Sequence, residues 1–106
     1  MKNQQSNNSE IPVYLTAIVT ALPGNIDIVK STLLNLVKNS TQEEACLQYD
    51  LHQSSEDEHV FIFQETWKDQ HSLDHHNQMP YLLEFVEIAK DIVQLPLIIY
   101  KTNKIS

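Results

Sequence analysis

The hydrophobic pattern changes its period within residues 59–80, HVFIFQETWKDQHSLDHHNQMP, and this change constrains the fold more than any other feature. The stretch begins with β-branched and aromatic residues, and apolar residues then alternate with polar ones, which predicts a strand over His59–Trp67. A helix is expected over Asp69–Gln78, because Asp69 can cap its start and Pro80 stops it. The chain is therefore expected to pass from sheet to helix at its one tryptophan.

The other elements follow from the same two periods. We expect strands over Val13–Leu22, Cys46–His52 and Leu97–Thr102, a helix over Asn25–Lys38, and a further helix beginning at Pro80. The order is β-α-β-β-α-β, with the second helical region in two pieces. This order predicts an α+β, ferredoxin-like fold, with a four-stranded antiparallel sheet and the helices on one face.

Charge and composition limit the partners of the chain. Residues 1–10 are almost entirely polar and predict a flexible tail, followed by one domain over residues 11–106. A net charge of −7 with only 7 basic residues argues against nucleic acid and against an anionic membrane surface. The absence of a long apolar run or a signal-peptide core predicts a cytoplasmic location.

One face of the predicted sheet lacks a cover. The helices occupy a single face, yet both faces of the first and third strands carry apolar residues. A partner is needed to cover the open face, and a second copy of the chain is the simplest partner. We therefore predict a homodimer whose two sheets face each other.

Three runs carry a family resemblance: EEACLQYDLH, then FIFQETW, then SLDHH followed by MP. In this order and spacing they resemble the antibiotic biosynthesis monooxygenase domain, over about Val13–Thr102. The resemblance implies a dimeric α+β barrel with a pocket between sheet and helices, and no need for a metal or flavin. The family includes cofactor-independent oxygenases of quinols and phenols, haem-degrading enzymes and an isomerase-like branch.

The haem-degrading branch does not match this sequence. By resemblance, that branch places an asparagine on the first strand, a tryptophan on the middle helix and a histidine on the long helix. These positions hold Ala17, His76 and Val86 here. We therefore expect no haem, and the resemblance itself implies no other cofactor.

A glutamate interrupts the aromatic row of the third strand. Phe61, Phe63, Glu65 and Trp67 point to one face of the strand. Either the row bends so that Glu65 reaches solvent or a lysine, or Glu65 is a buried carboxyl with a raised pKa that can relay a proton.

The histidines of the helix differ in direction. With about 100° per residue, His76 and Asn77 fall within about 60° of the apolar marker Leu73, and His71 and His75 fall on the opposite side. His76 is also the position that matches the family's recurrent histidine. It is read either as a catalytic base or as a buried structural histidine, with Glu65 as a candidate partner in both cases. His71 and His75 lie four residues apart, but no third ligand is evident, so we expect no metal.

The leading hypothesis is a monooxygenase acting on a small aromatic quinol or phenol. His76, with or without Glu65, would take a proton from the substrate hydroxyl, and the anion would reduce O₂ directly in a dry pocket. The predicted pocket residues are Phe61, Phe63, Trp67, Asn77, Tyr81 and Phe85. A binding module without turnover, and an isomerase of a small carbonyl compound, fit the same residues.

Overall fold

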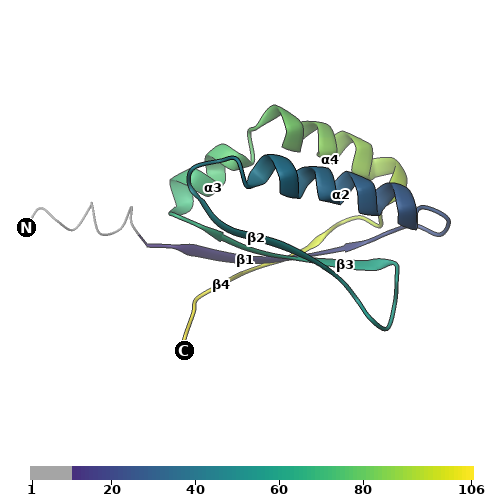
Figure 1. The fold of residues 1–106 in the computed structure, drawn as a ribbon, viewed down its shortest axis with the longest axis horizontal. Coiled ribbons are helices and arrows are strands. Elements are labelled where there is room, and N and C mark those ends of the chain that lie inside the picture. The colour runs from purple at the N-terminus through teal and green to yellow at the C-terminus, as the bar shows by residue number, and fades with distance from the viewer. Residues whose placement is uncertain (1–10) are drawn as a thin grey trace, which may run out of the picture.

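The computed structural model describes residues 11–106, and the tail predicted over residues 1–10 lies outside the described part. Within this range three helices lie on one face of a four-stranded sheet (Figure 1). The elements are β1 (Val13–Thr20), α2 (Ile26–Ser40), β2 (Cys46–Gln53), β3 (Val60–Trp67), α3 (Gln70–His76), α4 (Pro80–Ile92) and β4 (Ile98–Thr102). All the predicted elements are present, and the predicted ends shift by two residues or fewer.

The strand order confirms the ferredoxin-like plan. The sheet runs β2-β3-β1-β4, and each neighbouring pair is antiparallel. The two central strands, β1 and β3, place Leu15 opposite Glu65 and Ala17 opposite Phe63. Directly opposed residues of an antiparallel pair share a face, so the row that contains Glu65 points toward the helices.

Short signals in the chain set the helix ends. Asp69 accepts a hydrogen bond from the backbone N–H of Ser72 at 2.8 Å, which confirms the predicted cap of α3. Pro80 stands in the first turn of α4, where its missing N–H is not needed. Before α2, Gly24 adopts a φ of 83°, and Asn25 takes the N-cap position without a side-chain cap bond.

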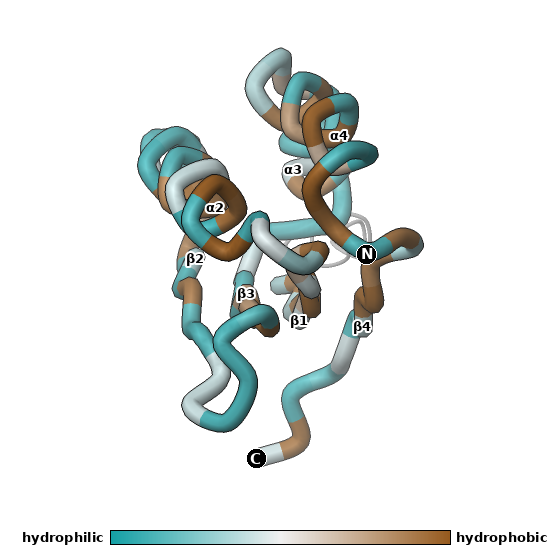
Figure 2. Tube along the Cα trace, turned by 90° about the vertical axis from the view of Figure 1, so that its right-hand side faces the viewer, coloured by the Kyte–Doolittle hydropathy of each residue, from teal (hydrophilic) through white to brown (hydrophobic). Residues whose placement is uncertain are grey.

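The core lies between the sheet and the helices (Figure 2). Viewed end-on, α2 covers the β2 side of the sheet and α4 covers the β4 side. The largest side chains with almost no exposure are Trp67, Phe61 and Leu33. Trp67 and Phe61 come from β3, and Leu33 comes from the buried face of α2, so strand alternation and helical period converge on one core.

Strand β2 departs from the simple alternation at its start. The pairing with β3 shifts between Cys46 and Gln48, so that Cys46 lies opposite Trp67. The extra residue, Leu47, is 59% exposed instead of sharing the buried row of Tyr49. A bulge of this kind adds one unpaired residue, and no periodic pattern in the sequence marks it.

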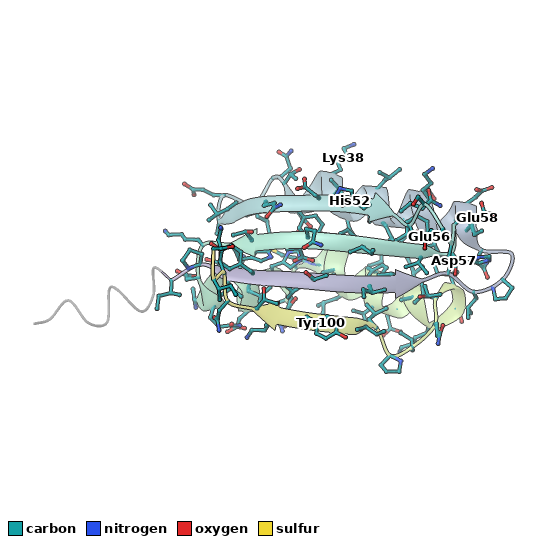
Figure 3. All side chains as sticks on the ribbon, turned by 90° about the horizontal axis from the view of Figure 1, so that it is seen from below. Lys38, His52, Glu56, Asp57, Glu58 and Tyr100 are labelled. Carbon is teal, nitrogen blue, oxygen red and sulfur yellow. The ribbon has the colours of Figure 1, made fainter. Side chains whose placement is uncertain are left out.

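The second face of the sheet has no helix over it (Figure 3). On this face the β1 residues Tyr14, Thr16, Ile18 and Thr20 are half-buried. Cross-strand hydrogen bonds such as Thr16 Oγ1 to Gln64 Oε1, at 2.9 Å, link its polar part. Figure 3 labels His52 on β2 and Tyr100 on β4, the two edge strands of this face.

No helix among residues 11–106 combines the length and the apolar character needed to cross a bilayer.

Candidate active site

A cavity of about 100 Å³ lies between the sheet and the helices. An engineered apolar cavity of about 150 Å³ is known to take up benzene, so this space is of the order of one aromatic ring. Residues from the sheet, the helices and their connections line it: Leu15, Ala17, Val19, Leu36, Tyr49, Phe63, Glu65, Leu73, His76, Asn77, Leu82, Phe85, Leu97 and Ile99. Most of these lining residues are apolar, and the few polar ones include Glu65 and His76.

His76 reaches the cavity from the last turn of α3. It is 2% exposed and shares the buried face of α3 with Leu73, whereas His71 and His75 are exposed. This confirms the angular assignment for the three histidines, whereas Asn77, which the same angles placed inward, is exposed. The His76 ring also packs against the Trp67 indole, with ring centroids 4.3 Å apart and planes inclined by 34°.

The partner of His76 is a carboxylate that the sequence did not single out. His76 Nδ1 lies 2.7 Å from Oε2 of Glu43, which stands in the turn after α2. The Tyr81 hydroxyl donates a short hydrogen bond to the same oxygen, and Ser40 Oγ lies 3.3 Å from that hydroxyl. We call Ser40, Glu43, His76 and Tyr81 the outer cluster.

The Glu43 bond selects the tautomer of His76. An ionised carboxylate only accepts hydrogen bonds, so Nδ1 carries the proton and Nε2 keeps its lone pair. The side-chain hydrogen bonds of His76 all involve Nδ1, so Nε2 has no hydrogen-bond partner within residues 11–106, and His76 lines the cavity. Burial lowers the pKa of His76, and the Glu43 hydrogen bond and charge only partly oppose this effect. The site therefore holds a neutral imidazole with a free basic nitrogen.

Glu65 does not bind His76, the partner considered for it in the sequence analysis, but Trp67. Its carboxyl accepts a hydrogen bond from the Trp67 indole N–H at 2.9 Å, whereas His76 binds Glu43. Glu65 is 7% exposed, which excludes the reading in which it reaches solvent. Burial raises the pKa of Glu65 to about 7, and the indole hydrogen bond opposes the shift. We call Glu65 and Trp67 the inner pair.

Three predicted pocket residues line the cavity and three do not. Phe63 and Phe85 face it, and Asn77 lies exposed at its rim as the C-cap of α3. The three residues absent from the lining are Phe61, Trp67 and Tyr81. Phe61 lies farther along β3, opposite Val19; Trp67 lies against His76; and the Tyr81 hydroxyl turns to Glu43.

Tyr49 also lines the cavity, although it is not among the predicted pocket residues. Its ring centroid lies 5.1 Å from that of Phe63 and 5.8 Å from that of His76. Burial raises the pKa of its hydroxyl, and the charge of Glu65 adds to this effect. The register supplies the explanation, because Tyr49 lies opposite Glu65 on the helix-facing side.

His71 and His75 line a hollow on the outer surface, together with Glu43 and Glu44. Nowhere in the described part of the chain do three or more His, Cys, Asp or Glu side chains meet in a way that could hold a metal ion. Glu43 belongs both to the lining of this hollow and to the outer cluster.

Comparison with known proteins gives a consistent result. Residues 12–88 match the family model described as "Antibiotic biosynthesis monooxygenase". A protein of Bacillus subtilis named "Putative monooxygenase YcnE" is 30% identical over 91 residues, which cover 86% of this chain and 96% of that protein. The crystal structure of PA3566 from Pseudomonas aeruginosa has a TM-score of 0.86 and 33% identity, over 92% of this chain and 98% of that one. A crystal structure described as "antibiotic biosynthesis monooxygenase" has a TM-score of 0.83 and 26% identity, over 89% and 99% of the two chains.

Proposed function

The chain belongs to the antibiotic biosynthesis monooxygenase family, and on this premise we propose that it is a cytoplasmic, cofactor-independent monooxygenase of a small aromatic quinol or phenol. The observation that carries the proposal is the free Nε2 of His76, backed by the Glu43 carboxylate, at a cavity of single-ring size. A base that is oriented by a carboxylate is suited to deprotonation of a phenolic hydroxyl.

The proposed reaction starts with proton transfer. The substrate hydroxyl gives its proton to His76 Nε2, and the resulting phenolate passes one electron to O₂. The phenoxyl radical and superoxide then combine at a ring carbon, and the peroxide takes the proton back from His76. Loss of water, which carries away the hydrogen of that ring carbon, leaves a quinone oxygen in its place. One O₂ is consumed and one water is formed.

Glu65 takes part in the last steps of the proposed reaction, in which water is lost and the quinone oxygen forms. With its pKa raised to about 7, it is present both as an acid and as a carboxylate near neutral pH. Such a group can donate a hydrogen bond to a developing quinone oxygen, or accept the ring proton that is lost with water. The apolar wall of the cavity keeps competing water away from the radical pair.

Oxygen uptake tests the proposal directly. We expect the wild-type protein to consume O₂ with members of a panel of hydroquinones and phenols. His76→Ala should lower the rate by about 100-fold or more, the usual contribution of a general base. His75→Ala is the matched control, because it removes an exposed histidine of the same helix, and it should leave the rate unchanged.

The other outcomes of this experiment separate the competing functions. Equal rates for His76→Ala and wild type would remove His76 from the mechanism. Turnover of a carbonyl substrate without O₂ would favour an isomerase instead. Binding of an aromatic ligand without any product would favour a binding module.

A homodimer through facing sheets completes the proposal. Members of the family commonly form dimeric α+β barrels. The open sheet face offers apolar side chains in register, with Ile18 opposite both Ile62 and Ile98. Tyr100 on the same face is 57% exposed, and covering it would remove apolar surface from water. Sedimentation should give twice the chain mass at micromolar concentration, and a monomer mass would contradict the proposal.

A further inference from the structure

A larger hollow lies next to the cavity, between α4 and the segment that leads into β4. Its volume is about 530 Å³. Its wall includes Val86 and Ala89 from α4 and Leu95 and Pro96 from the segment before β4. We call this hollow the side groove. Val86 is 50% exposed and Leu95 is 51% exposed, so the side groove presents apolar surface to water.

The side groove and the cavity share a wall. Phe85, Leu97 and Ile99 line both spaces. These three shared side chains are apolar, so a substituent that passes from the cavity to the side groove would meet no polar group at this boundary. The polar atoms that would handle the reacting hydroxyl, on His76 and Glu65, line only the cavity and not the side groove.

The charge of the side groove also points to an apolar occupant. Lys90 is the one charged residue in its wall, and its ammonium group lies 3.1 Å from the Glu87 carboxylate. The remaining wall offers hydrocarbon and aromatic surface. Burial of a methylene group in such surroundings is favourable by about 0.8 kcal/mol when the burial is complete.

We infer that the side groove binds an apolar substituent of the substrate, so that the substrate class is a single-ring phenol or quinol that carries an alkyl chain. This inference rests on the proposed function, because it takes the ring and its hydroxyl as the ligand of the cavity. The ring provides the chemistry at His76, and the chain provides affinity and selects among phenols.

Binding of a homologous ligand series tests the inference without any need for turnover. The probes are phenol, 4-propylphenol and 4-hexylphenol, and the readout is the fluorescence of Trp67, the one tryptophan of the chain, which packs on His76. For the wild type we expect affinity to rise about two- to fourfold for each added methylene. Val86→Glu should remove this gain while phenol itself binds as before.

Leu83→Glu is the matched control. Leu83 lies on the same helix, is 48% exposed and does not line the side groove. The control introduces the same charge and should keep the full dependence on chain length. Equal affinities for phenol and 4-hexylphenol in the wild type, or equal behaviour of the two variants, would overturn the inference.

Two further measurements, of oxygen uptake and of sedimentation mass, separate the inference from the proposed oxygenase and from binding of a second copy in the side groove. Chain-dependent binding without O₂ uptake would contradict the proposed oxygenase and leave the ligand class standing. An O₂ uptake rate that does not depend on the length of the alkyl chain would contradict the inference but would remain consistent with the proposed oxygenase. If Val86→Glu changes the sedimentation mass and not the chain dependence, a second copy covers the side groove and the inference fails.

Discussion

The outer cluster and the inner pair each contain one glutamate, and the two glutamates meet different surroundings. Glu43 accepts hydrogen bonds from His76 and Tyr81, and its side chain is 12% exposed beside a surface hollow. Glu65 accepts one hydrogen bond, from Trp67, and is buried against the aromatic core. The number of donors and the access of water decide whether a carboxyl serves as a fixed partner or as a proton-exchanging group.

The consequence is a division of labour within one small site. Glu43 orients His76 and fixes its tautomer, which is a positioning role. Glu65 lines the cavity and has its pKa raised to about 7, which suits proton exchange. The predictions below test this difference, beginning with the largest expected effect.

Glu65→Gln should change how stability depends on pH. The folded-state pKa of Glu65, about 7, lies above its unfolded value of 4.5. Its contribution to stability is therefore fully present below pH 4.5 and is lost as pH rises through 7. The loss amounts to about 3 kcal/mol. Urea unfolding should show that, between pH 4.5 and pH 8, the free energy of unfolding of the variant rises relative to that of the wild type by about this amount.

Glu84→Gln provides the control for this experiment, because Glu84 is exposed on α4. Its stability should follow the wild type at every pH. A Glu65→Gln curve that runs parallel to the wild type would mean that folding does not change the pKa of Glu65. Glu65 would then not differ from an ordinary carboxylate, and the contrast with Glu43 would disappear.

Glu43→Gln should lower kcat/KM by about 100-fold, the upper range for the loss of a carboxylate that orients a histidine. The amide can present its N–H₂ group to Nδ1, which would move the imidazole proton to Nε2 and block the base. Proton–nitrogen correlation NMR of the free protein reports the tautomer without any turnover. The proton should be on Nδ1 in wild type and on Nε2 in the variant.

Glu44→Gln is the matched control for Glu43→Gln, since Glu44 is the exposed neighbour. It should leave both the rate and the tautomer unchanged. A wild-type protein with its proton on Nε2 would refute the positioning role of Glu43 even if the protein proves to be an oxygenase.

Trp67→Phe should raise the pKa of Glu65 further, because the indole N–H is the hydrogen bond that holds it down. We expect a coupling energy of about 1.5 kcal/mol between Trp67 and Glu65 at pH 8, measured by a double-mutant cycle with Glu65→Gln. Additive effects of the two substitutions would show that the indole and the carboxyl do not act as a pair.

Tyr81→Phe should have the smallest effect. It removes one of the two donors to Glu43 and leaves the His76 bond in place. A loss of about 1 kcal/mol in stability and a fall in kcat/KM of roughly fivefold are expected. A loss as large as that of Glu43→Gln would instead make Tyr81 an equal member of the outer cluster.

The sequence predicted the fold well because the fold depends on local periods. Alternation placed Phe63 and Glu65 on one face of β3, and the angle from Leu73 separated His76 from the exposed histidines. The resemblance of the motifs to one family agreed with this plan, and the family match confirms it. The bulge at Leu47 was missed because it changes the register without changing the pattern.

The sequence predicted several residues of the site but not their hydrogen-bond partners, because one of these pairs joins distant parts of the chain. Glu43 lies 33 residues before His76, in a polar link with no periodic signal. Its place depends on how the turn after α2 meets α3, and therefore on tertiary packing. Glu65 and Trp67 are two residues apart on one strand, yet alternation shows only that they share a face, not that they bind each other.

The bond between Glu43 and His76 also affects local motion. Helix α3 has only 7 residues, and helices shorter than about 12 residues are marginal in water without outside support. His76 therefore sits on an element that depends on outside contacts to stay folded, and these include the burial of Leu73 and the contacts of His76 with Glu43 and Trp67. Opening of α3 would remove the base from the cavity before the sheet is disturbed. The amide protons of α3 should exchange with solvent sooner than those of β1 and β3, and a ligand bound at His76 should slow that exchange.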